Sequence, residues 1–161
     1  MEIRKTKIEE LDKVMAIYAH ARQFMAETGN PNQWGNIKPR REWIAADIKN
    51  GNSYVCVEKD EIAATFFYSN EPDPTYAQIY DGAWVNDRAY GVVHRIASAG
   101  TIKGAGSFCL NWAFAQCGNL KIDTHHDNIV MQNTLKKNGF VYCGIIYLED
   151  GDERMAFQKE A

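Results

Sequence analysis

The sequence has no excess of basic residues. Its 161 residues include 18 Lys and Arg against 21 Asp and Glu, which gives a formal net charge of -3. Affinity for nucleic acid depends largely on Lys and Arg that neutralise phosphates. This balance therefore argues against a nucleic-acid partner.

Long hydrophobic runs are also missing. No apolar run approaches the roughly 20 residues that span a bilayer, and residues 1–5 lack the apolar core of a signal peptide. We therefore expect no membrane partner and a cytoplasmic location. With 45% apolar and 12% aromatic residues, the chain suits one compact domain over residues 1–161.

Metal-ligand spacings are absent as well. The four cysteines show no Cys-x-x-Cys spacing, so we interpret them as small core hydrophobes. The acidic turn 149–153 lacks the ligand spacing of an EF-hand. His125 and His126 are adjacent, and neighbours on a strand point to opposite faces. We expect no bound metal.

Helical periodicity and turn residues predict the elements. Thr6 and Glu9 form a predicted capping box that opens a helix. Two strand–helix units in the second half imply one parallel pairing. The predicted helices cover 7–28, 39–50, 104–117 and 128–138, and the predicted strands cover 53–58, 62–68, 90–98, 120–124, 140–148 and 154–158, with residues 78–85 extended. This order predicts an α/β fold with a mixed, mostly antiparallel sheet and helices on both faces.

The most informative segment is the predicted strand 90–98 with the glycine turn and helix that follow it. Gly104 and Gly106 open the helix directly. The first turn of a helix has unpaired backbone N–H groups and the positive end of the dipole, so it can hold a phosphate or diphosphate. This segment therefore predicts a cofactor that carries an anion.

Two other phosphate-binding folds fit less well. In a dinucleotide-binding fingerprint the third glycine would fall at Cys109, and the chain has too few strand–helix repeats for a doubly wound sheet. A P-loop would need Gly-Lys-Ser or Gly-Lys-Thr, which does not follow at the right spacing.

The element order and residues 90–140 resemble the GNAT superfamily of N-acetyltransferases, which transfer an acetyl group from acetyl-CoA to an amine. Thr101-Ile-Lys-Gly-Ala-Gly106 is similar to the superfamily's Gln/Arg-x-x-Gly-x-Gly/Ala pattern, with Thr101 at the lead position. Asn128-x-x-Met131 and Leu135-x-x-x-Gly139-Phe140 are similar to its second segment. Leu135 stands where a tyrosine often protonates the departing CoA thiolate.

The resemblance implies acetyl-CoA as cosubstrate and a set of residues that bind it. A backbone N–H at Ile96 or Ala97 would polarise the thioester oxygen. The cofactor residues implied in this way are Ile96, Ala97, Ser98, Thr101, Lys103, Gly104, Ala105, Gly106, Ser107, Asn128 and Lys136.

Acetyl transfer needs a group that deprotonates the amine, and histidine suits this near neutral pH. His94, in the middle of the strand beside the cofactor, is the first candidate for the base. His125, with Asp123, is the second candidate, although these residues could simply cap the next helix. Tyr142 and Tyr147 are candidate proton donors.

The acceptor pocket is implied to come from the loop between the first two helices, the loop before the central strand and the final hairpin. These segments contain Trp34, Asp81, Trp84 and Tyr147. Aromatic walls with a carboxylate suit a cationic or apolar amine, whether a small molecule or a peptide. A CoA-binding sensor without turnover is the alternative function, and a homodimer joined by late strands is an open alternative to a monomer.

Overall fold

One mixed sheet runs through the chain. The computed structural model describes residues 1–161. Its seven strands lie in the order β1-β2-β3-β4-β5-β7-β6, and only β4 and β5 pair in parallel. The strands are β1 (Glu2–Lys5), β2 (Ser53–Glu58), β3 (Glu61–Ser69), β4 (Gly91–Ser98), β5 (Asn119–Thr124), β6 (Val141–Tyr147) and β7 (Glu153–Glu160). The predicted mixed, mostly antiparallel fold is confirmed.

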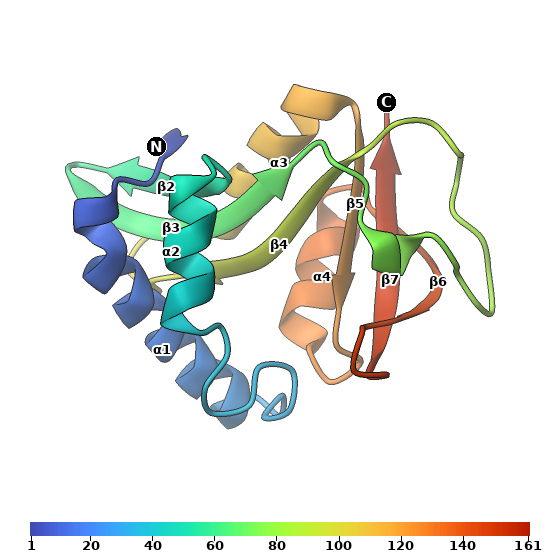
Figure 1. Ribbon diagram of the computed structural model, residues 1–161, viewed down its shortest axis with the longest axis horizontal. Coiled ribbons are helices and arrows are strands. Elements are labelled where there is room, and N and C mark those ends of the chain that lie inside the picture. The colour runs from blue at the N-terminus through green and yellow to red at the C-terminus, as the bar shows by residue number, and fades with distance from the viewer.

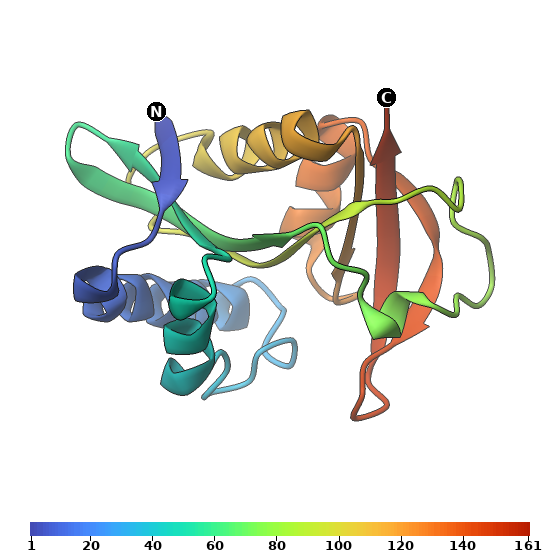
Figure 2. The ribbon, with the colours of Figure 1, turned by 45° about the horizontal axis from the view of Figure 1, so that its top comes forward.

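Four α-helices cover the two faces of this sheet, as Figure 1 and Figure 2 show. They are α1 (Leu11–Glu27), α2 (Arg41–Lys49), α3 (Ala105–Cys117) and α4 (Ile129–Lys137). The pair α1 and α2 builds one apolar core against Val55 and Ala97, whereas α3 and α4 build a larger one on the opposite face. None of the helices combines the length and the apolar character that crossing a membrane requires.

The beginning of the chain differs from the prediction. Residues 2–5 form an edge strand that the sequence analysis missed, and a single 3-10 turn at Ile8–Glu10 precedes α1. Thr6 does not cap the helix, because its hydroxyl bonds that of Ser53 at 2.8 Å. Instead the Glu10 carboxylate accepts the backbone N–H of Lys7 at 2.8 Å. The capping interaction thus lies one residue later than predicted.

The segment between β3 and β4 is mostly irregular. The predicted extended stretch 78–85 is reduced to one bridge, in which Tyr80 and Ile145 exchange two backbone hydrogen bonds of 2.8 Å. Ala83 adds a bond from its N–H to the Cys143 carbonyl at 2.9 Å. This segment therefore covers the outer edge of β6, the last strand of the sheet.

The later predictions hold to within a residue or two at most element ends. Asn128 caps α4 through its side-chain oxygen, which accepts the Met131 N–H at 3.0 Å. The strand order of the final hairpin could not be predicted from pairing rules alone. β7 inserts between β5 and β6, so β5 pairs with β7 and not with β6, the next strand in the sequence.

Candidate active site

The two parallel strands separate soon after they meet. β4 and β5 pair only at Gly91 with Leu120 and Val92 with Lys121. From Val93 onward the backbone of β4 has no strand on this edge. The sheet therefore opens toward the carboxyl ends of β4 and β5, where an extended substrate can enter and bond free backbone groups.

A β-bulge in β4 helps to produce this opening. Thr65 pairs with Ala97 and Phe67 with His94, so that Arg95 and Ile96 together face one residue of β3. Arg95 has a φ of +50°, a left-handed conformation that is strained for a side chain of this size. The buried Tyr18 of α1 supports it by donating its hydroxyl to the Arg95 carbonyl at 2.9 Å.

The glycine turn after β4 has the geometry of an anion site. Gly104 is the N-cap of α3 with a φ of +84°, and no side chain caps the helix. The first backbone bond of this helix end runs from the Phe108 N–H to the Gly104 carbonyl at 3.0 Å, so the N–H groups of residues 105–107 precede the helical ladder. A Cβ placed on Gly104 or Gly106 would meet nothing within 4 Å. The space beside these amides is open.

The other residues implied for the cofactor lie around this opening. Ile96 and Asn128 line the cavity described below, whereas Ser98, Thr101, Lys103 and Lys136 are exposed. The Ser98 hydroxyl accepts the Gly100 N–H at 3.1 Å, and the Ser107 hydroxyl accepts a bond from Asn138 at 2.9 Å. Leu135 is fully buried in the core under α3 and offers no proton.

A cavity of about 600 Å³ adjoins the opened strands. Its walls come from β4 and β5, from the α1–α2 connection, from the turn at residues 73–75 and from the β6–β7 hairpin. His94 lines it with one quarter of its side chain exposed. The structure thus brings His94 and the strand opening to the same cavity.

His94 lies between two carboxylates. Its Nε2 is 2.7 Å from Asp73 Oδ2, and its Nδ1 is 3.9 Å from Asp123 Oδ2. Burial alone would raise the pKa of Asp73, but hydrogen bonds from His94 and Thr75 outweigh it and lower this pKa to about 2. Asp73 is therefore ionised near neutral pH and fixes the orientation of the imidazole.

Asp123 has a partner of its own. The hydroxyl of the buried Tyr76 donates to Asp123 Oδ2 at 2.6 Å. Burial and the nearby carboxylate raise the pKa of Tyr76 well above its usual value, which keeps this phenol protonated as a donor. The sequence analysis missed Asp73 and Tyr76, because both lie in an irregular segment and only the fold brings them to His94.

Gln33 is a third residue that was not predicted from the sequence. Its side-chain oxygen accepts bonds of 2.9 Å from both Asn30 and Asn128. Its backbone carbonyl accepts a bond from Arg154 at 3.1 Å. The α1–α2 connection is thereby tied both to the cap of α4, on the cofactor side, and to β7.

The four residues implied for the acceptor pocket do not lie together. Trp34 lines the cavity that contains His94. Trp84 lines a separate depression beside Lys121, and its indole donates to the Tyr76 carbonyl at 2.9 Å. Asp81 and Tyr147 line neither, and the ring of Tyr147 packs edge-on against Tyr80.

Two other candidates lie outside this cavity. Tyr142 is about half exposed on β6, where its ring packs against Phe157. His125 lies in the turn after β5, where its Nδ1 accepts the Asp127 N–H at 3.0 Å. Burial, with the charge of Arg154, lowers the pKa of His125. Neither side chain lines the space around His94.

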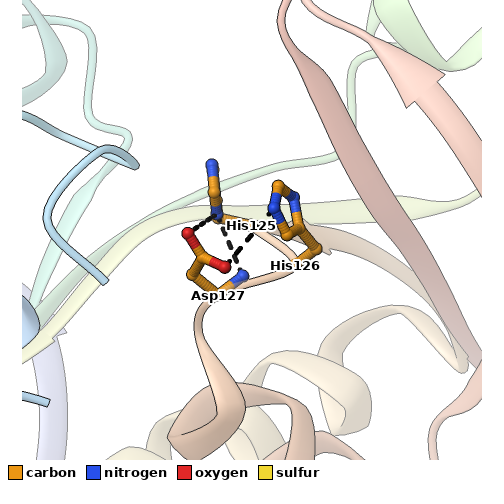
Figure 3. Close-up of side chains that lie close together, drawn as sticks. All are labelled: His125, His126 and Asp127. Carbon is orange, nitrogen blue, oxygen red and sulfur yellow. Dashed lines mark hydrogen bonds and ion pairs between the residues drawn. The ribbon is translucent and has the colours of Figure 1, made fainter. Parts of the chain in front are cut away.

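His125 and His126 were predicted to point to opposite faces of a strand, but they do not lie on a strand in the structure. Both residues follow the end of β5, and their rings stack with centroids 4.3 Å apart. Figure 3 shows them beside Asp127, with one ligand atom of each of the three within 4.8 Å of the others. The His125 Nδ1 lone pair already accepts a backbone N–H in this arrangement.

Solved structures with similar folds include several acetyltransferases. A GNAT-family acetyltransferase from Streptococcus agalactiae is 32% identical with a TM-score of 0.86, and the match covers 99% of this chain and 95% of that one. This chain therefore belongs to the GNAT family of acetyltransferases, and it is an acyltransferase enzyme.

More distant structures share the fold. A putative acetyltransferase from Staphylococcus aureus is 22% identical over 99% of each chain, with a TM-score of 0.72. A putative acetyltransferase from Salmonella typhimurium, solved with acetyl-CoA, is 11% identical over 99% of this chain and 92% of that one, with a TM-score of 0.65. No family model and no curated protein sequence matches this chain.

Proposed function

We propose that this enzyme transfers the acetyl group of acetyl-CoA to a primary amine of a small molecule or peptide. The observation that carries this proposal is the position of His94, held by Asp73 in a cavity that adjoins the opened strands β4 and β5. Membership of the acetyltransferase family and the Salmonella structure with acetyl-CoA support the choice of cosubstrate.

The residues present fit a CoA diphosphate beside α3. The amides of Ala105, Gly106 and Ser107 point out of the first helical turn, and the two glycines leave room for an anion. Thr101, Lys103 and Lys136 are the exposed polar and cationic side chains that would add to this binding. No metal has a part in this proposal.

The rest of the cosubstrate would follow the free edge of β4. Backbone groups of Ile96, Ala97 and Ser98 bind the pantetheine arm, and a backbone N–H of Ile96 or Ala97 polarises the thioester oxygen. The Thr124 hydroxyl lines the same cavity, is fully buried and has no hydrogen-bond partner. A buried hydroxyl of this kind is costly when unpaired, so it is a further candidate to bind the arm.

The protein's main chemical contribution is proton removal. Acetyl-CoA supplies the acetyl thioester; the amine nitrogen forms a bond to the acetyl carbon while the carbon–sulfur bond breaks. His94 takes one proton from the amine, and the sulfur leaves as a thiolate that water protonates, since Leu135 replaces the usual tyrosine and Tyr142 lies outside the cavity. The net products are an amide and free CoA. Asp73 stabilises the imidazolium that His94 becomes.

Thiol release tests this function directly. The protein is incubated with acetyl-CoA and a broad amine panel while free thiol is measured. Thiol that appears only when an amine is present supports the transferase. Saturable CoA binding without release for any amine would favour the alternative, an acyl-CoA sensor, for which the buried Leu135 is the supporting observation. Absence of CoA binding would reject both functions.

A further inference from the structure

We infer that the acceptor binds as its protonated ammonium ion between His94 and Asp123, and that it carries no carboxylate on the carbon next to the amine. The inference rests on the proposed acetyl transfer and names the class of amine that the site accepts. It assigns Asp123 a role in binding the acceptor and Asp73 a positioning role.

The first step is the gap between His94 and Asp123. Hydrogen bonds between nitrogen and oxygen are about 2.9 Å long, so the 3.9 Å separation of His94 Nδ1 from Asp123 Oδ2 is too long for one. The bond of 2.7 Å to Asp73 assigns the imidazole proton to Nε2 when His94 is neutral. The lone pair of His94 Nδ1 then faces the Asp123 carboxylate, and no hydrogen-bond donor of the protein lies between these two acceptors.

An ammonium group completes this arrangement. Its nitrogen can lie about 2.9 Å from both acceptors and donate one proton to each. Asp123 is poised for a cation, because its side chain is only 10% exposed and the Tyr76 hydroxyl occupies just one of the two lone pairs of Oδ2, the oxygen that faces His94. The proton given to His94 is then the one that must leave before the nitrogen can attack, and the second proton, released as the amide forms, passes through water to the departing CoA thiolate.

The positive charges around the cavity do not pair with the carboxylates beside His94. Lys38 lies 3.7 Å from Asp150, and Arg95 bonds Asp47 at 2.7 Å while its Nε has no hydrogen-bond partner. Arg154 is buried, with its guanidinium on the backbone carbonyls of Gln33 and Glu153. None of these three cations pairs with Asp73 or Asp123, so the charge immediately around the amine nitrogen stays negative.

A carboxylate attached to the amine-bearing carbon would instead meet like charge. It would lie within a few ångströms of Asp73 and Asp123, both of which are less than one-fifth exposed. Unpaired like charges in a partly desolvated site cost several kcal/mol in general. Free α-amino acids are therefore poor acceptors, whereas amines with a neutral stem are good ones.

The walls of the cavity indicate what that stem should be. Trp34 reaches it from the α1–α2 connection and Trp43 from the first turn of α2, and Phe67 packs against the His94 ring with centroids 5.6 Å apart. Aromatic rings favour apolar groups and cations alike. An amine with an aromatic or alkyl stem fits this combination.

Two probes that differ only in the carboxylate test the inference. Phenethylamine and phenylalanine have the same stem, and kcat/KM is measured for each with acetyl-CoA at saturation. We expect phenethylamine to be preferred by at least about 100-fold, which corresponds to the repulsion of one carboxylate. Calorimetry with CoA present should show binding of phenethylamine and none of phenylalanine at the same concentration.

The variant Asp123→Asn shows whether this carboxylate is responsible. We expect it to reduce the preference at least tenfold and to raise the KM for phenethylamine, with CoA affinity unchanged. Asp127→Asn, which lies just after β5 in the β5–α4 connection and outside the cavity, should keep the full preference. If Asp123→Asn does not fold, the preference measured on the unaltered protein still decides the inference.

The outcomes separate this inference from the proposed function. Equal or faster acetylation of phenylalanine would overturn the inference and leave acetyl transfer intact. An unchanged preference in folded Asp123→Asn would overturn the role of that residue. Failure of every amine to release thiol, with either probe, would overturn the proposed function itself.

Discussion

The two sides of the proposed active site are built from different parts of the chain. The side implied for the cofactor is made largely of backbone: the free edge of β4 and the amides of residues 105–107. The acceptor side is made of side chains from β4, β5 and three separate connections, with His94, Asp73 and Asp123 at its centre. Backbone geometry tolerates sequence change, so the acceptor side is where members of one family can differ most.

The largest effect is expected from His94→Ala, which removes the base on the acceptor side. Loss of a general base typically lowers turnover by about 10²- to 10⁴-fold, and the pH–rate profile should change with it. Steady-state kinetics across pH measure both. His126→Ala, an exposed histidine outside the cavity, is the control; an unchanged pH–rate profile in His94→Ala would remove it from the role.

The cofactor side is tested by a pair of glycines at opposite ends of α3. Gly104 and Gly118 both have left-handed backbones, with φ values of +84° and +67°, and a Cβ on either would meet nothing within 4 Å. Each Gly→Ala change should cost about 1 kcal/mol of stability. Only Gly104→Ala should weaken CoA binding, by about tenfold, as calorimetry would reveal. Equal CoA affinities in the two variants would contradict the diphosphate site.

Asp73→Asn tests how far the acceptor side depends on a positioned imidazole. The folded-state pKa of Asp73, about 2, is below the ~3.9 of an unfolded aspartate. Its contribution to stability is therefore complete above about pH 4 and is lost as the pH falls toward 2. The variant should flatten the stability curve in this window and lower turnover.

Glu10→Gln is the control for that variant. A hydrogen bond from Arg4 leads the interactions that lower the pKa of Glu10 to about 2, far from the cavity. Glu10→Gln should flatten the same part of the curve of stability against pH and leave turnover unchanged. A loss of turnover equal to that of Asp73→Asn would mean that general destabilisation explains both.

The smallest effect is expected where the two sides meet, at the β4 bulge. Tyr18→Phe removes the hydroxyl that bonds the Arg95 carbonyl. One buried hydrogen bond contributes about 1 kcal/mol, so chemical denaturation should show a loss of that size. Turnover should fall only slightly, because the opening of β4 from β5 depends on several strands. A loss of CoA binding would show instead that this bond holds the bulge.

Most of the fold could be predicted from periodicity and turn residues, because the elements that carry those signals are long. The strand β1 was missed because four residues at a sheet edge have no periodicity to detect. The capping interaction was misplaced by one residue, because both Thr6 and Lys7 have a glutamate three residues later in the sequence. Only the contact of Thr6 with Ser53 shows that the cap involves Lys7 and Glu10.

The candidate site also has a part that could be predicted from the sequence and a part that could not. Gly104 and Gly106 are recognisable because a helix that opens with glycines after a strand has a local physical meaning. Asp123 was selected only together with His125, and its approach to His94 depends on the parallel pairing of β4 with β5. Asp73 could not be predicted as a partner, since it lies 21 residues from His94 in an irregular segment. The dispersal of Trp84, Asp81 and Tyr147 likewise depends on the path of the connection before β4.

The covering of β6 by residues 80–83 has a consequence for how copies of the protein can join. The main-chain groups of Cys143 and Ile145 that an incoming strand would need are already engaged. Gly82 makes this possible, because a side chain there would collide with the Cys143 carbonyl. We therefore expect Gly82→Ala to displace residues 80–83 from β6. The exposed strand edge would then favour association between copies of the enzyme.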